Sequence, residues 1–254
     1  MRGRNTSWDR FAGWYDDLLE NREGTYQEEL ILPNLLRLLR VKKGQVVLDL
    51  ACGQGFFCRG YQQTGATVIG ADISKRLIQL ARARSPEGIR FEVAPADRLS
   101  FLENETIDVV TIVLAIQNIE NVHGTFAECS RVLKPWGRLL MVLNHPAFRI
   151  PGASDWGWDE NGKQYRRVYR YMSETRVKIR MHPGIDPEAY TISFHRPLQY
   201  YFKLLAKYGF YVSRLEEWIS HKRSQPGPRA EAENTARKEI PLFLFIEGTK
   251  MGPH

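Results

Sequence analysis

The sequence predicts an α/β fold in which helices cover both faces of a doubly wound, mostly parallel sheet. Three observations support this prediction. Short apolar runs alternate with helical patterns between residues 46 and 143, as they do in parallel sheets built from strand and helix units. Glycines separate the first apolar run from the first helical pattern. The run Ile107–Ala115 is almost wholly apolar and rich in β-branched residues, which is typical of a central strand buried on both faces.

Length and composition favour one domain. The chain has 254 residues, of which 43% are hydrophobic, so we expect a single domain over residues 1–254 with an insertion at 145–196. The cysteines Cys52, Cys58 and Cys129 lack metal-ligand spacing, which predicts no metal site and a reducing, cytoplasmic compartment. No apolar run approaches the roughly 18 residues of a membrane span, and the first residues lack the apolar core of a secretory signal.

The net charge is +7, which would help an anionic partner approach the surface. The positive residues are spread through the chain, and only residues 166–180 and 221–223 are locally basic. Such segments are most often solvated surface. A nucleic-acid partner is therefore only weakly supported.

The first elements are expected to be helices. Residues 8–19 place apolar side chains at the spacing of one buried helical stripe, which predicts a lid-like amphipathic helix. Residues 26–40 repeat the pattern, but Pro33 should break it or start a new helix. We expect these helices, over residues 8–40, to lie against the ligand site.

A strand, a tight turn and a helix follow. Val46–Leu50 has the composition of a buried strand, and small residues at 51, 53 and 55 allow the backbone to approach a ligand closely. The next predicted strand, Thr67–Asp72, ends in an acid. A carboxylate there can accept hydrogen bonds from both hydroxyls of a ribose. The pattern indicates an adenosine-containing cofactor.

Two cofactors fit this turn. Residues 53–58, Gly-Gln-Gly-Phe-Phe-Cys, nearly match the dinucleotide fingerprint. Asp49 at the strand end argues against a pyrophosphate and suits a cationic amino-acid cofactor. The residues therefore favour S-adenosylmethionine over NAD. The plain structural alternative is a glycine turn in which Asp49 caps the helix.

The chain continues with the same alternation. Ser74 is expected to cap a helix that ends near Ser85. Further elements are expected as a strand at 89–93, a strand at 107–115, a helix at 122–133 with Phe126, Cys129 and Leu133 inward, a stop at Lys134–Gly137 and a strand at 138–143.

Five motifs in order resemble those of class I S-adenosylmethionine-dependent methyltransferases, most closely the small-molecule and quinone-biosynthesis branch. The motifs are Val47–Gly55, Gly70–Ser74, Ala96-Asp97, Asp108–Val110 and Arg131–Gly137, and a Tyr15-Asp16 pair lies in the first helix as in that branch. The resemblance covers residues 8–144, and the C-terminal part more loosely. It implies a Rossmann-like, seven-stranded sheet whose last strand, at 240–247, is antiparallel and inserted between the fifth and sixth.

The resemblance also implies a cofactor site without a metal. Asp49 and the backbone of Gly53–Gly55 would hold the methionine end, Asp72 the ribose, and Asp97 the adenine amino group. The full expected set is Tyr15, Asp49, Ala51, Cys52, Gly53, Gly55, Asp72, Ile73, Ala96, Asp97, Arg98, Leu114 and Ala115. Ala51 and Trp136 stand where many members have glycine. From its residues alone, Asp97 fits a helix cap equally well.

The acceptor is expected at the carboxyl ends of the fourth and fifth strands, near Asn118 and His145. His145 could take a proton from an acceptor, since imidazole titrates near neutral pH, or it could fix the turn before Pro146. Tyr15, Asn118 and His195 are lesser candidates for this catalytic role.

The insertion at 145–196 is rich in aromatic residues, with alternating polarity at 175–181 and 190–194 that predicts two added strands. It could cap the acceptor and exclude water, or form a small satellite core. Tyr165, Arg166, Arg167 and Arg170 also suit base stacking and phosphate contacts. A helix at 197–208, a strand at 211–217 and a polar surface connection at 222–239 complete the fold.

We interpret the sequence as that of a methyltransferase that carries the methyl group of S-adenosylmethionine to a small-molecule nucleophile and releases S-adenosylhomocysteine. An RNA or protein methyltransferase, or a protein that binds the cofactor without catalysis, remain the alternatives. The sequence does not indicate the acceptor atom or the oligomeric state.

Overall fold

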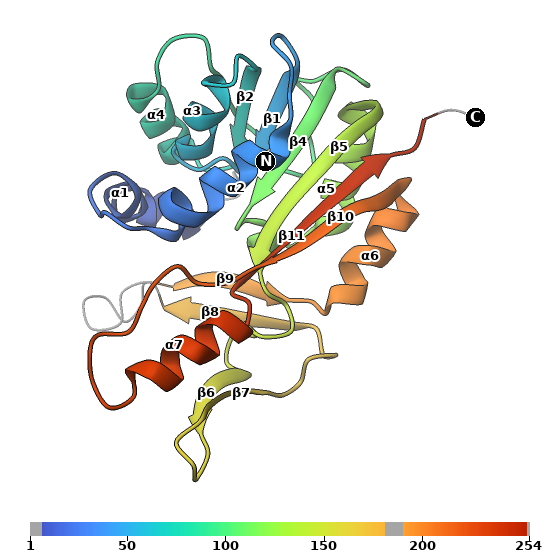
Figure 1. The fold of residues 1–254 in the computed structure, drawn as a ribbon. Helices are drawn as coiled ribbons and strands as arrows, with labels where there is room; N and C mark the ends of the chain where they lie inside the picture. Colours follow the sequence, from blue (N-terminus) through green and yellow to red (C-terminus); the bar gives the residue numbers. More distant parts are fainter. Residues whose placement is uncertain (1–6, 181–189, 253–254) are drawn as a thin grey trace.

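A seven-stranded sheet forms the centre of the molecule, in the order β10-β11-β5-β4-β1-β2-β3 (Figure 1). The structure is a computed structural model that describes residues 7–180 and 190–252. The strands of this sheet are β1 (Val46–Leu50), β2 (Thr67–Asp72), β3 (Arg90–Val93), β4 (Ile107–Val113), β5 (Leu133–Asn144), β10 (Phe210–Trp218) and β11 (Phe243–Lys250).

Strand directions confirm the predicted fold class. The pairs β1–β2, β1–β4, β2–β3 and β4–β5 are parallel. Strand β11 pairs antiparallel with both β5 and β10, so it is the inserted antiparallel strand that the family resemblance implied. Strand β4 is the middle strand, as the apolar run at 107–115 predicted.

Helices bury both faces of the sheet. On one face lie α5 (Val122–Val132) and α6 (Leu198–Lys207), whose Phe126, Cys129 and Leu205 join the core there. On the other face lie α2 (Leu32–Leu39), α3 (Phe56–Gln62) and α4 (Lys75–Arg84), which contribute Leu35, Phe57 and Ile78. The two separate cores are the result of winding the chain on both sides of the sheet.

The N-terminal helices form as the sequence predicted. Helix α1 (Ser7–Glu20) is followed by a π-helical turn, Gln27–Ile31, which continues directly into α2. Pro33 lies in the first turn of α2, directly after the π-helical turn, and its ring ends the regular backbone hydrogen bonding of the preceding turn because it has no N–H. The proline therefore starts a new helix, one of the two outcomes expected.

Strand β5 begins earlier than predicted. The stop expected at Lys134–Gly137 is instead part of the strand, which runs from Leu133. Its register against β4 shifts in this region, and Trp136 has φ 64°. The four residues form an irregularity within the strand because an exposed bulge can be inserted without breaking the flanking pairs.

The insertion after β5 consists of two antiparallel hairpins near the end of the sheet where β4 and β5 finish (Figure 1). The hairpin β8 (Thr175–Arg180) with β9 (Tyr190–His195) confirms the two predicted strands within the described residues; Met181 lies outside them. The hairpin β6 (Ser154–Trp158) with β7 (Gln164–Val168) was not predicted. Helix α7 (Ala230–Glu239) lies against β7.

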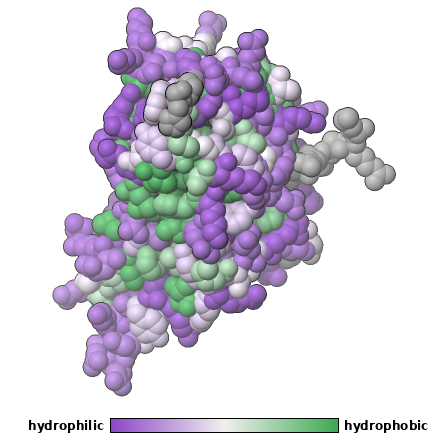
Figure 2. Space-filling model, turned by 90° about the vertical axis from the view of Figure 1, so that its right-hand side faces the viewer, coloured by the Kyte–Doolittle hydropathy of each residue, from purple (hydrophilic) through white to green (hydrophobic). Residues whose placement is uncertain are grey.

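Strand β10 forms one edge of the sheet, and its side chains Tyr211 and Leu215 are exposed. Figure 2 shows the side of the molecule on which β10 and α6 lie, where apolar side chains gather between polar margins. None of the helices in residues 7–180 and 190–252 combines the length and apolar composition needed to cross a membrane.

Candidate functional site

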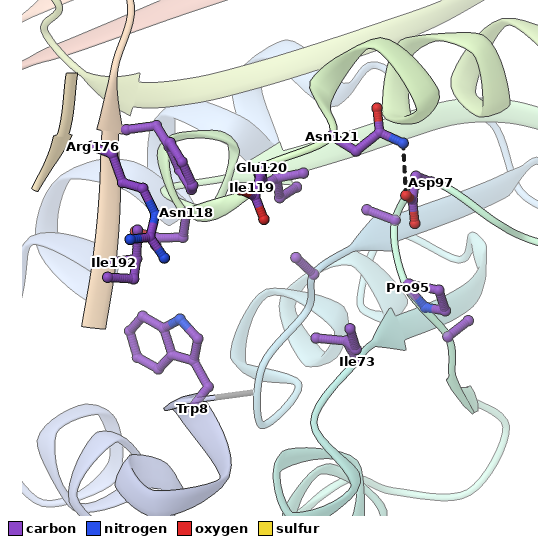
Figure 3. Close-up of a pocket in the computed structure, with 14 residues that line it drawn as sticks. Trp8, Ile73, Pro95, Asp97, Asn118, Ile119, Glu120, Asn121, Arg176 and Ile192 are labelled. Carbon is purple, nitrogen blue, oxygen red and sulfur yellow. Dashed lines mark hydrogen bonds between the residues drawn. The ribbon is translucent and has the colours of Figure 1, made fainter. Parts of the chain in front are cut away.

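A cavity of about 320 Å³ opens at the carboxyl ends of the central strands, between the sheet, α1 and the β8–β9 hairpin (Figure 3). This is the position at which doubly wound sheets bind ligands, and the volume is within the range of small-molecule sites. The residues that line it are Trp8, Ala51, Ile73, Ala94, Pro95, Ala96, Asp97, Asn118, Ile119, Glu120, Asn121, Arg176, Ile192 and Phe194.

The glycine turn after β1 is held by Asp72. Ala51, Gly53 and Gly55 all have positive φ, at 60°, 58° and 84°, and glycine adopts such angles without a Cβ penalty. The Asp72 carboxylate at the end of β2 accepts hydrogen bonds from the backbone N–H of Gly53 (3.0 Å) and of Ser74 (2.8 Å). An ionised carboxylate offers about four acceptor positions, so the same group can still accept from ribose hydroxyls.

Carboxylates concentrate negative charge around this turn. Burial raises the pKa of Asp72 to about 6, against the backbone N–H groups that lower it, and Asp9 raises it further. Burial likewise raises the pKa of Asp49 to about 7, with a smaller contribution from Asp72. Uncompensated acids of this kind favour a cationic ligand and disfavour a pyrophosphate. The electrostatics agree with S-adenosylmethionine, whose sulfonium and ammonium are both cations.

Asp49 itself lies beneath the turn and does not line the cavity. Its oxygens accept hydrogen bonds from the hydroxyl of Thr111 (2.8 Å) and from the thiol of Cys58 (3.4 Å). The side chain is 1% exposed. Asp49 is therefore too buried to contact a ligand in the cavity directly, and it would act on one through its charge.

One side of the cavity is apolar with a polar edge, and we call it the nucleoside slot because the sequence predicts the nucleoside there. Ile73, Pro95 and Ala96 line it, and Asp97 lies at its rim. The Asn121 side-chain amide donates to the Asp97 carboxylate at 2.8 Å. The predicted residue Arg98 is exposed and outside the lining. Apolar side chains with an acid at their edge are the kinds of group that suit an adenine ring and its amino group.

Helix α1 covers the glycine turn. A Cβ placed on Gly53 would lie 3.2 Å from Cε1 of Tyr15, so the ring rests on the backbone of the turn. Burial and the nearby Asp72 raise the pKa of Tyr15 well above its usual value. The phenol therefore stays protonated, which makes it a hydrogen-bond donor and a poor base.

Polar contacts fix α1 in this position. The Ser74 hydroxyl donates to Asp9 (2.5 Å), and Arg84 pairs with Asp16 (2.5 Å). Glu20 near the end of α1 pairs with Arg59 and accepts from the side-chain amide of Gln54, a buried residue of the turn. The predicted lid-like helix is thus tied to the cofactor side of the site.

The side of the cavity opposite the nucleoside slot is built from distant segments. Trp8 comes from α1, Arg176 from β8, and Phe194 from β9. Arg196 is buried, and its guanidinium donates to the carbonyls of Ile119 (3.0 Å) and Glu120 (3.1 Å). This contact joins the hairpin to the loop that carries Asn118, which lines the cavity as predicted.

The two predicted histidines lie outside the cavity lining. Nε2 of His145 is 2.7 Å from Glu217, and its Nδ1 accepts from the backbone N–H of Ala147 (3.2 Å). Burial lowers the pKa of His145, although Glu217 opposes that shift. A neutral ring with Nε2–H donating and Nδ1 accepting satisfies both contacts and leaves no nitrogen free to take a proton. Nε2 of His195 lies 2.7 Å from the Tyr171 carbonyl.

Several other predicted residues lie outside the cavity lining: Tyr15, Cys52, Gly53, Gly55, Asp72, Leu114 and Ala115. Cys52 is buried, and a Cβ on Gly70 of β2 would lie 3.0 Å from its sulfur. Leu114 has φ 52° and donates its backbone N–H to Val142. Leu114 and Ala115 are part-buried beside the cavity but are absent from its lining.

Two basic residues of the β6–β7 hairpin, Arg166 and Arg167, are paired with other groups of this chain. Arg166 donates to the Phe148 carbonyl (2.8 Å) and stacks 5.2 Å from the centre of the Trp156 ring. Arg167 forms a two-bond pair with Asp155. Arg170 lies in the left-handed region at φ 55°, in the turn after β7.

Nine residues of the lining were not predicted as site residues from the sequence: Trp8, Ala94, Pro95, Ile119, Glu120, Asn121, Arg176, Ile192 and Phe194. Trp8 was assigned only to an apolar stripe, and Arg176 and Phe194 only to strands. The one available signal for Arg176 was its place in a run of alternating polarity within the insertion after the fifth strand. Asn121 is a residue type that often caps helices, and its side chain caps α5 by accepting from the backbone N–H of Gly124.

Comparisons with known proteins agree with this geometry. A family model described as "Methyltransferase domain" matches residues 48–141. A demethylmenaquinone methyltransferase of Tropheryma whipplei is 36% identical over 158 residues, 61% of this chain and 59% of the relative. A ubiquinone/menaquinone biosynthesis C-methyltransferase of Psychromonas ingrahamii is 31% identical over 162 residues, 57% of this chain and 62% of the relative.

The chain thus spans about 59% and 62% of the lengths of these two curated relatives. A solved structure matches over more of its length. The S-adenosylmethionine-dependent methyltransferase of Mesorhizobium loti is 28% identical with a TM-score of 0.68, covering 86% of this chain and 96% of that chain.

Proposed function

We propose that this chain, which belongs to the S-adenosylmethionine-dependent methyltransferases, transfers the methyl group of that cofactor to a small molecule. The observation that carries the proposal is the two-sided cavity. Its nucleoside slot ends in Asp97, and its opposite side is lined by Trp8, Ile192 and Phe194. A purely cofactor-binding protein would have no need of a second lined side.

The residues fit the cofactor. In this proposal Asp72, which lies behind the lining, would hold the ribose, Ile73 and Ala96 would contact the faces of adenine, and Asp97 would meet its amino group. The backbone of the Ala51–Gly55 turn and the phenol of Tyr15 would hold the methionine end. The negative charge of Asp49 and Asp72 would stabilise the bound cations.

When bound, S-adenosylmethionine supplies a methyl group already activated by its sulfonium. The chain's contribution is therefore to align the acceptor and to exclude water, and alignment alone can account for several kcal/mol of the barrier. Trp8 and Phe194 offer flat apolar contacts for the acceptor, and Arg196 holds the loop of Asn118 against the hairpin. Of the four predicted catalytic candidates, Asn118 lines the cavity and can orient an acceptor oxygen or nitrogen.

A ring-shaped acceptor fits the lining best. The relatives named for menaquinone and ubiquinone biosynthesis support such an acceptor by similarity. The β8–β9 hairpin would then act as the acceptor cap expected of residues 145–196. An RNA acceptor is less well supported, because Arg166 and Arg167 are engaged by Ser154, Asp155 and Phe148.

The test has two stages. Calorimetry should show that S-adenosylhomocysteine binds the purified protein and that Asp72→Asn weakens this binding. Wild-type protein incubated with methyl-labelled cofactor and fractionated metabolite extracts should then yield a labelled small molecule. Cofactor binding without any labelled product from metabolite, RNA or protein pools would favour the non-catalytic alternative, and absence of cofactor binding would remove the proposal.

A further inference from the structure

The β8–β9 hairpin presents one cationic face. Residues directly opposite each other in an antiparallel pair have side chains on the same face. The register pairs Arg176 with Phe194, Lys178 with Ile192 and Arg180 with Tyr190. Phe194 and Ile192 line the cavity, so Arg176 lies on the face that looks into it, and it lines the cavity as well.

Figure 3 shows the guanidinium of Arg176 extending into the cavity beside Asn118 and Ile192, above Trp8. The labelled residues of the nucleoside slot, Ile73 and Pro95, lie on the other side of the cavity in the same view. Arg176 is therefore placed where an acceptor would lie.

Arg176 differs from three other arginines around the site, whose side chains are paired. Arg59, Arg84 and Arg196 are all held by carboxylates or carbonyls. Within residues 7–180 and 190–252, no hydrogen bond or ion pair of the Arg176 side chain is found, while its backbone pairs with Phe194 in the β8–β9 ladder. Among the described residues, Glu120, an acid that also lines the cavity, forms no ion pair with Arg176.

We propose that Arg176 is a specificity-determining residue that binds an anionic oxygen of the acceptor. The inference rests on the proposed function. The acceptor class is a flat, largely apolar molecule carrying a carboxylate, a phosphate or an ionised ring hydroxyl. Its ring would lie against Trp8 and Phe194, while its anionic group meets the planar guanidinium, which matches such oxygens with two parallel hydrogen bonds.

The cofactor has a carboxylate of its own, which is the other anion that could reach Arg176. The two sources are separated by measuring cofactor and acceptor binding independently. If Arg176 binds the acceptor, its removal leaves affinity for S-adenosylhomocysteine unchanged. If it binds the cofactor carboxylate, that affinity falls and the proposal is overturned.

The experiment uses the full chain saturated with S-adenosylhomocysteine and two probes of equal shape, 2-naphthoate and the neutral 2-naphthamide. Calorimetry is expected to show at least tenfold tighter binding of 2-naphthoate to the wild type, a difference of about 1.4 kcal/mol. In Arg176→Met this preference should disappear. Arg176→Lys keeps the charge without the two-pronged geometry and should retain part of it.

Arg180→Met is the matched control, because it removes a cation from the same strand and face at a position outside the cavity lining. It should preserve the preference for 2-naphthoate. Equal binding of the two probes by the wild type, no binding of 2-naphthoate at millimolar concentration, or an unchanged preference in Arg176→Met would each overturn the inference. Loss of S-adenosylhomocysteine binding by the wild type would instead remove the proposed function itself.

Discussion

The two sides of the cavity are built in different ways. The nucleoside side consists of strand ends and turns, with Asp72 fixing backbone N–H groups of two neighbouring segments. The opposite side consists of single side chains, Trp8, Arg176 and Phe194, delivered by a helix and a hairpin far apart in the sequence. The residues of the first side follow the strands of the central sheet, whereas those of the second side come from elements outside that sheet. Changes on one side should therefore leave the other largely intact.

The largest expected effect is on the nucleoside side. Asp72→Ala removes the proposed acceptor for the ribose and leaves the N–H groups of Gly53 and Ser74 without their partner. Hydrogen bonds to a charged group are worth about 1.5–3 kcal/mol, so affinity for S-adenosylhomocysteine should fall by about 100-fold or more. Calorimetry measures this loss. Asp97→Asn, which keeps an oxygen acceptor at the rim, is the milder control, and equal affinity in wild type and Asp72→Ala would contradict the assignment.

A second effect concerns the charge of the nucleoside side. Because the folded-state pKa values of Asp49 and Asp72 are raised, to about 7 and about 6, the folded protein binds more protons than the unfolded chain between roughly pH 4 and 7. Stability of the ligand-free protein should thus decrease as pH rises through this window. A cationic ligand favours the ionised acids, so its affinity should increase over the upper part of the same window.

Release of one proton on binding corresponds to at most about a tenfold gain in affinity per pH unit. Calorimetry from pH 5.5 to 8 should show a steeper rise for S-adenosylmethionine than for S-adenosylhomocysteine, which lacks the sulfonium charge. Asp49→Asn removes the group with the higher pKa and should flatten the part of the curve near pH 7. Parallel curves for the two ligands would show that the carboxylates do not respond to the sulfonium.

On the opposite side, Trp8→Ala should reduce turnover without a comparable loss of cofactor affinity. Loss of one large aromatic contact costs about 1–2 kcal/mol, or roughly tenfold in kcat/KM for the labelled product. A change at Tyr15 should instead affect cofactor affinity, because the Tyr15 ring rests on Gly53 of the glycine turn. Tyr15→Phe keeps that ring contact and serves as the comparison within α1. A large loss of S-adenosylhomocysteine affinity in Trp8→Ala would mean that the two sides are not separable.

The same contrast explains what the sequence could predict. The glycine turn and Asp72 lie within 20 residues of each other on consecutive strands, so their pattern and spacing were sufficient. The strands β8 and β9 were also predictable from alternating polarity. That Arg176 faces the cavity, while Arg166 and Arg167 turn to partners in their own hairpin, depends on register and long-range packing. Likewise, nothing near His145 in the sequence indicated its partner Glu217, which is 72 residues away on β10.

The smallest expected effect is that of His145. With one ring nitrogen donating to Glu217 and the other accepting from Ala147, the imidazole joins the end of β5 to the edge strand β10. His145→Gln should lower stability by about 1 kcal/mol, seen as a Tm decrease of about 2–4 °C, and leave kcat nearly unchanged. Glu217→Gln should behave in the same way. A general base would instead contribute about 10²–10⁴-fold to kcat, so a loss of that size in His145→Gln with an unaltered Glu217→Gln would restore the histidine to the catalytic role that its sequence position suggested.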